Sequence, residues 1–196
     1  MAKLQPWYKV ITPREDLREE RPLDAAEFAV HLDKVRIGQA PPDYSKPDRF
    51  FERTYLTQTL TDLAAQVVRR LSGEITETSA VYNMATQFGG GKTHALALLY
   101  HLAKGGSKAG TWRDVSKILT KAGVASIPDK CAVAVFVGTE FDSLRGRGGN
   151  DGTPFRKTPW GEIAFQLGGE GAFSVVASHD EQFIDPKGDA IEAFLP

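Results

Sequence analysis

Cysteine, net charge and long hydrophobic runs are all scarce in this sequence. Cys131 is the single cysteine, which excludes a disulfide within the chain. The 24 lysines and arginines nearly balance the 25 aspartates and glutamates, so the formal charge is −1. A balance of this kind gives no general attraction to nucleic acid or to membranes, although it still allows a local basic patch.

Two kinds of targeting segment are also missing. The longest clearly apolar run, residues 132–137, is far shorter than the ~20 residues that a membrane helix needs. Residues 1–7 lack the apolar core of a secretion signal. We therefore expect a protein without a membrane segment, located in the cytoplasm. Its 196 residues, of which 41% are hydrophobic, are enough for one domain or slightly more.

Residues 79–100 carry the strongest pattern in the chain. An apolar run at residues 80–84 leads into a glycine-rich bend, and a helical pattern follows it. Glycine permits positive φ and a close approach of the backbone to a ligand, so that N–H groups of the bend and the helix N-terminus point at phosphate oxygens. The sequence therefore predicts a phosphate-binding P-loop, whose candidate nucleotide-binding residues are Thr86, Phe88, Gly89, Gly90, Gly91, Lys92, Thr93 and His94.

The expected ligands of this loop are ATP and Mg²⁺. Lys92 is expected to reach the β- and γ-phosphates, and the Thr93 hydroxyl is the expected metal ligand. Thr86 occupies a position where the general pattern has glycine, so the alternative is a glycine-rich turn that only happens to precede Lys-Thr. For His94, we favour a solvent-facing or packing role over catalysis.

The order of the expected elements predicts an α/β fold. A strand at residues 80–84, helices at residues 92–104 and 112–122, and a buried strand at residues 132–137 form a parallel unit with a right-handed crossover. We predict a P-loop NTPase with a partial parallel sheet flanked by helices. Residues 1–77 are expected to be a helical amino-terminal extension packing on a core at residues 78–196, which ends before its Walker B strand.

Three further segments have more than one interpretation. Glu140 follows the second expected strand, but Gly138 and Thr139 stand where a Walker B aspartate is usual, so Glu140 is not assigned as the catalytic base. Residues 53–57 either border the adenine and ribose or pack in the core. The loop at residues 143–161 is either solvated or touches phosphates or nucleic acid through its basic residues, Arg145, Arg147, Arg156 and Lys157.

Residues 53–57, 86–94 and 158–169 together resemble the amino-terminal part of a family of large, poorly characterised bacterial P-loop ATPases of the AAA+ type. The resemblance implies that Thr86 is normal at its position and that Lys92 and Thr93 contact phosphate and magnesium. Genes of this family often lie near DNA methyltransferases in phage-defence clusters. That association implies a defence role, with DNA or a DNA methyltransferase as a partner of the full-length protein.

The leading hypothesis is an ATPase module that drives a larger defence or DNA-processing machine. Family members are longer and carry Walker B further on, so we expect a truncated unit that binds nucleotide weakly, with an apolar run ending in Asp-Glu soon after residue 196. One alternative is a nucleotide-dependent scaffold that does not hydrolyse ATP. A small P-loop kinase is a weaker alternative, because 78 residues precede the P-loop strand. A homo-oligomer is left open.

Overall fold

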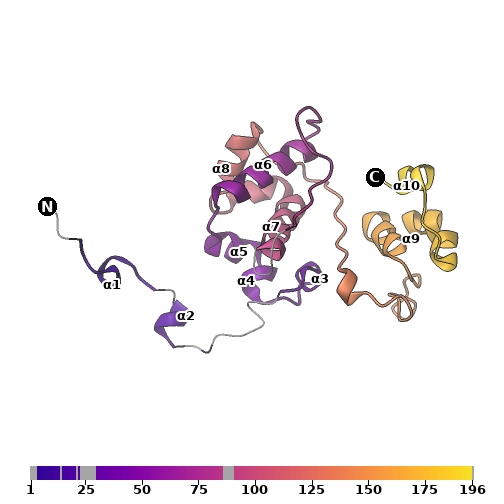
Figure 1. Cartoon of the computed structure of the whole chain (residues 1–196), viewed down its shortest axis with the longest axis horizontal. Helices are drawn as coiled ribbons and strands as arrows, with labels where there is room; N and C mark the ends of the chain where they lie inside the picture. The colour runs from indigo at the N-terminus through magenta and orange to yellow at the C-terminus, as the bar shows by residue number, and fades with distance from the viewer. Residues whose placement is uncertain (1–3, 14, 21, 23–29, 86–90, 196) are drawn as a thin grey trace.

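The protein is described by a computed structural model that covers residues 4–13, 15–20, 22, 30–85 and 91–195. Its described elements are almost all helices (Figure 1). They are α1 (Trp7–Val10), α2 (Glu15–Arg18), α3 (Leu32–Arg36), α4 (Pro42–Ser45), α5 (Pro47–Arg53), α6 (Gln58–Leu71), α7 (Lys92–Gly105), η2 (Gly106–Thr111), α8 (Val115–Ala122), η3 (Gly138–Glu140), α9 (Pro159–Gln182) and α10 (Gly188–Phe194).

The main hydrophobic cluster is formed by η2 and four α-helices, α5, α6, α7 and α8, which lie together in Figure 1. Helix α6 is amphipathic and packs its apolar face on α7 and α8, where Val68, Leu98 and Ile118 are fully buried. The Phe51 ring stacks on Trp112, with 5.1 Å between the ring centroids. Burial of this apolar surface holds the four helices together, and α7 in particular is fixed between its neighbours.

A second, smaller cluster is formed by α9 and α10 at the carboxyl end of the described chain (Figure 1). Helix α9 is interrupted at Gly168 and Gly169, whose φ angles are −143° and 65°. The second half of α9 and then α10 pack against its first half, burying Ala164, Val176 and Phe194. Two consecutive glycines predict the end of a helix, and the helical backbone does break at this pair, because glycine alone takes the φ of 65° without strain.

The α/β prediction is wrong. The described residues contain no strand and no sheet, only one isolated antiparallel bridge between Arg147 and Arg156, so the chain does not have an α/β P-loop NTPase fold with a partial parallel sheet. Both runs expected to be strands, residues 80–84 and 132–137, lie outside any ladder.

The reason is that hydrophobicity does not supply a strand with a partner. A strand is stable only when neighbouring backbone pairs with its N–H and C=O groups, and a parallel strand also needs both faces covered. Here the Val81 side chain is 80% exposed, and the backbone of Val135 is paired instead by the side-chain amide of Gln166. The apolar run at residues 132–137 is held by a helix side chain rather than by a sheet.

The predicted division of the chain at residues 77 and 78 stays a prediction. The main cluster takes α6 from one side of this boundary and α7 and α8 from the other. Among the described residues, no helix combines the length and the apolar character that crossing a membrane requires.

Candidate functional site

The start of α7 is the part of the predicted loop that the structure describes. Gly91 is the N-cap residue and has φ 75° and ψ 13°, a left-handed conformation that favours glycine. No side chain of the described residues caps this end of the 14-residue helix. The first N–H groups of α7 therefore have no partner within the helix and form a weakly positive terminus, which is the electrostatic requirement for binding an anion. The predicted loop residues Thr86, Phe88, Gly89 and Gly90 lie outside the described residues.

Lys92, Thr93 and His94 form the first turn of α7, and all three are half-buried. Successive residues of a helix point in directions about 100° apart, so these three side chains leave the helix on different sides. Lys92 and Thr93 are thus adjacent to the same group of N–H donors without sharing one face of the helix. His94 points toward the packed helices.

His94 is held by polar and aromatic neighbours on both sides of its ring. Its Nε2 lies 3.1 Å from Thr54 Oγ1, its Nδ1 lies 3.4 Å from Tyr44 Oη, and the Phe50 ring centroid is 4.7 Å away. Burial lowers the pKa of the imidazole below its usual value near 6.5, so the ring is neutral at pH 7. The arrangement orients His94 within the packed helices and anchors the first turn of α7 to α4 and α5.

The segment after α5, residues 53–57, reaches the same turn of α7 through Thr54. The Thr54 hydroxyl donates to the Phe50 carbonyl oxygen at 2.6 Å and lies in contact with His94. The next residue differs sharply, because the Tyr55 side chain is 85% exposed. Thr54 is therefore a packing residue, whereas Tyr55 presents an aromatic ring to solvent beside the candidate site.

Tyr44 and Phe50 are site residues that sequence reasoning missed. Tyr44 lies in α4, within a proline-rich stretch that the pattern predicts to be a loop, and an isolated aromatic residue between prolines has no periodicity to mark it. His101 joins this group about two turns further along α7, with its Nε2 2.7 Å from the Tyr44 carbonyl oxygen. Only the packing of α4 on α5 and α3 brings Tyr44 to α7.

The acidic residue singled out in the sequence, Glu140, is paired with a histidine. Glu140 lies in η3 with its carboxylate 3.2 Å from His31 Nδ1, both side chains being about two-fifths exposed. Within the described ranges there is no group of three or more His, Cys, Asp or Glu side chains arranged to hold a metal ion. Thr93 is the one proposed metal ligand in the described part of the predicted loop, and a metal bound there would need further ligands from a phosphate group.

The comparison with protein families gives a direct match to the chain. The family model described as the DUF499 N-terminal domain matches residues 7–196. The chain belongs to this family. None of the curated proteins and none of the solved structures matches the chain. The DUF499 N-terminal domain match includes α1 to α10, and thus both hydrophobic clusters and the start of α7.

This match confirms one part of the resemblance noted in the sequence. The chain is the amino-terminal domain of an uncharacterised family. The description of the DUF499 N-terminal domain carries no ligand and no reaction. Any activity must therefore be argued from the geometry of the domain itself.

Proposed function

We propose that this domain binds ATP with Mg²⁺ at the start of α7. The observation that carries the proposal is the left-handed Gly91 at an uncapped helix terminus, followed at once by Lys92 and Thr93. Helix N-termini of this kind bind phosphate because their N–H groups and the helix dipole both favour negative charge. Lysine adds a full positive charge and threonine adds a neutral oxygen ligand, which together suit a nucleotide phosphate with its metal ion.

Each residue has a distinct role in the proposed complex. Lys92 binds the β- and γ-phosphates, and Thr93 binds Mg²⁺ through its hydroxyl oxygen. His94, neutral and held between Thr54 and Tyr44, is a positioning residue that fixes the direction of the first turn. Thr86, Phe88, Gly89 and Gly90 complete the proposed loop by their place in the sequence.

Hydrolysis of ATP by a longer protein containing this domain is the reaction that we propose. A relationship with AAA+-type ATPases, and a role in phage defence or DNA processing with DNA or a DNA methyltransferase as partner, rest on the resemblance of residues 53–57, 86–94 and 158–169 alone. A nucleotide-dependent scaffold that does not hydrolyse ATP is the second candidate. It is favoured by the pairing of the Glu140 carboxylate with His31, and by the described residues holding no group of three or more His, Cys, Asp or Glu side chains arranged to bind a metal ion.

Lys92→Ala is expected to remove most of the stabilisation of the domain by ATP. A ligand present at 100 times its dissociation constant stabilises the folded state by about 2.7 kcal/mol, so ATP with Mg²⁺ raises the melting temperature of the wild-type protein. The variant loses most of this rise because the phosphates lose their cationic partner. Differential scanning calorimetry with and without ATP measures the difference.

Lys108→Ala is the matched control for that experiment. It removes an equal charge from an exposed site in η2, beyond the opposite end of α7. The control should keep the full ATP-dependent rise in melting temperature. An equal rise in the wild-type and Lys92→Ala proteins, or no rise in the wild type, would refute nucleotide binding at this terminus.

Thr93→Ala is expected to weaken binding of Mg²⁺–ATP by about tenfold while changing metal-free binding little, because the hydroxyl contacts the metal rather than the phosphate. Thr93→Ser keeps the hydroxyl and should restore the affinity. Calorimetric titrations with magnesium and with a chelator separate the two cases. If Thr93→Ala costs the same affinity in both titrations, the side chain is not a metal ligand.

A further inference from the structure

A polar cavity of about 680 Å³ lies at the opposite end of α7 from the proposed nucleotide site. Its charged and phenolic lining comes from α3, α7, α9 and the loop between residues 147 and 156, namely Arg36, Tyr100, Lys104, Arg147, Asp151, Arg156 and Glu162. Helices α3 and α7 contact each other directly, so the cavity has a packed wall on that side. Its volume falls within the range of ~300–1,000 Å³ that is typical of small-molecule sites.

Positive charge exceeds negative charge in and around this cavity. Four cationic side chains line it (Arg36, Lys104, Arg147 and Arg156) together with two carboxylates, Asp151 and Glu162. A third carboxylate, Asp33, lies behind Arg36 and Arg147, with oxygens 2.9 and 2.8 Å from their guanidinium nitrogens. Burial raises the pKa of Asp33, but hydrogen bonds and charge from Arg147 and Arg36 outweigh it and hold the pKa below its usual value. The ionised carboxylates thus leave one positive charge uncompensated.

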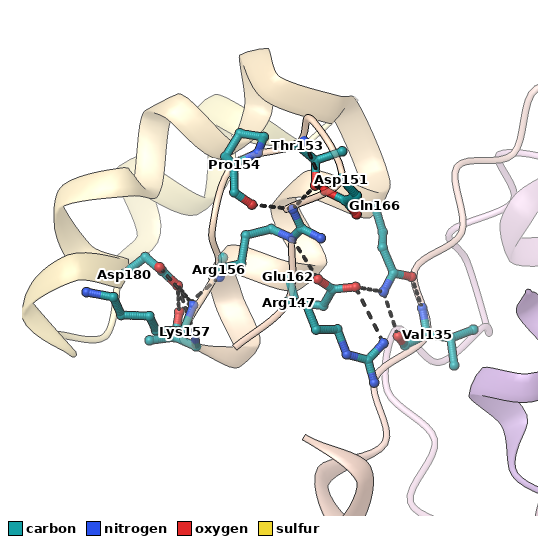
Figure 2. Close-up of polar contacts among 12 residues, drawn as sticks. Val135, Arg147, Asp151, Thr153, Pro154, Arg156, Lys157, Glu162, Gln166 and Asp180 are labelled. Carbon is teal, nitrogen blue, oxygen red and sulfur yellow. Dashed lines mark hydrogen bonds and ion pairs between the residues drawn. The ribbon is translucent and has the colours of Figure 1, made fainter. Parts of the chain in front are cut away.

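Arg156 is buried and held rigidly in the wall of the cavity. Figure 2 shows its guanidinium bound through Nε to Glu162 at 2.8 Å and through Nη1 to Thr153 Oγ1 and the Pro154 carbonyl oxygen. The guanidinium also lies 4.0 Å from the centroid of the Phe165 ring. A guanidinium has five N–H donors, and those of Nη2 bond to none of the described residues. Arg156 therefore keeps two oriented donors for a ligand.

Glu162 does not present a bare negative charge to such a ligand. Its carboxylate accepts from Arg156 Nε and, at 2.6 Å, from Gln166 Nε2, and it lies 3.8 Å from Arg147 Nη1 (Figure 2). Its residue is 2% exposed. The carboxylate oxygens are already paired within the protein, so the main effect of Glu162 is to hold Arg156 and Arg147 in place.

Lys104 supplies an exposed cation on the wall that α7 forms. It is exposed, it lies in the last turn of α7, and it makes no polar contact with the described residues. Twelve residues separate it from Lys92, which corresponds to about 18 Å along a helix axis. The cavity is thus a different site from the proposed nucleotide site.

We propose that this cavity binds a small polyanion carrying phosphate or carboxylate groups. A guanidinium group can donate two parallel hydrogen bonds to the oxygens of a phosphate or of a carboxylate. Asp33 already orients Arg36 and Arg147, and Glu162 already orients Arg156. A concave site suits a compact ligand rather than the extended backbone of a nucleic acid. Lys104 adds a fourth positive charge to the site from the wall that α7 forms.

Isothermal titration of the full 196-residue protein with inorganic pyrophosphate and with citrate tests this proposal. Lys104→Glu should weaken binding of the preferred anion by about tenfold or more, because it replaces an attractive charge by a repulsive one. Lys108→Glu makes the same change in total charge at an exposed residue that does not line the cavity, and it should leave the affinity unchanged. Unchanged melting temperatures for both variants confirm that they are folded.

The same titration in Lys92→Ala separates the two sites, because pyrophosphate is also a ligand for a phosphate-binding helix terminus. Binding that persists in Lys92→Ala and falls in Lys104→Glu supports the cavity, and the tighter of the two anions identifies the phosphate or carboxylate chemistry. Equal affinities in Lys104→Glu and Lys108→Glu would overturn the proposal. So would binding that is lost only in Lys92→Ala, or the absence of binding by either anion to the wild-type protein.

Discussion

Glu162→Ala is expected to lower the free energy of unfolding by about 3–5 kcal/mol, because it leaves the buried Arg156 guanidinium without its carboxylate. The side chains of Glu162 and Arg156 are 3% and 6% exposed, so solvent cannot replace the lost partner. Gln166 also loses the acceptor that holds its amide against the backbone of Val135. Urea unfolding followed by circular dichroism measures the effect as a lower midpoint.

Two further variants separate this mechanism from a general sensitivity of α9. Glu170→Ala removes an exposed carboxylate from the same helix and should change stability by no more than about 0.5 kcal/mol. The double variant Arg156→Leu, Glu162→Leu removes both buried charges and should be more stable than Glu162→Ala. A loss for Glu162→Ala as small as that of Glu170→Ala would mean that the ion pair is unimportant for folding.

Phe50→Ala is expected to cost about 3–5 kcal/mol of folding stability, the usual range for removing a fully buried aromatic ring. Phe50 is 1% exposed and its ring contacts Tyr44, Phe51, His94 and His101. The cavity left behind also removes the support of the His94 ring. We therefore expect weaker ATP binding by the folded fraction as well, measured by titration at a temperature well below the lowered midpoint.

Tyr55→Ala is the control for Phe50→Ala. It removes an aromatic ring of similar size five residues along the chain, but from a side chain that is 85% exposed, so stability should change by no more than about 0.5 kcal/mol. If both variants unfold at the same urea concentration, Phe50 does not support the core beneath α7.

The sequence by itself determined the helices of the main cluster. The apolar spacing of residues 60–71 predicts an amphipathic helix, and the structure has α6 there. The helices predicted at residues 112–122 and after the glycine-rich bend are confirmed as α8 and α7. Helices can be predicted in this way because their hydrogen bonds are local and their buried face repeats every 3.6 residues. The interruption of α9 at its glycine pair can be predicted from the sequence in the same way, because it depends on the φ angles of the two glycines themselves.

The same reasoning failed for the two apolar runs at residues 80–84 and 132–137. An apolar run records that a segment is hydrophobic, whereas a strand exists only if distant backbone pairs with it. In the structure, Gln166 satisfies Val135, and Val81 is exposed. The sequence pattern alone does not show whether the backbone of an apolar run will pair with another strand or with the side chain of a helix.

In the candidate sites too, local features were predictable from the sequence and contacts between distant residues were not. The order Gly91, Lys92, Thr93 at a helix start is local and was predicted from the sequence, and α7 begins at Lys92. The neighbours of His94 and the joining of Arg36 and Lys104 to Arg156 in one cavity were decided only by the tertiary structure. These residues are far apart in the sequence and follow no periodic pattern. They meet because the helices that carry them bury their apolar faces against one another, and that packing depends on contacts between distant segments.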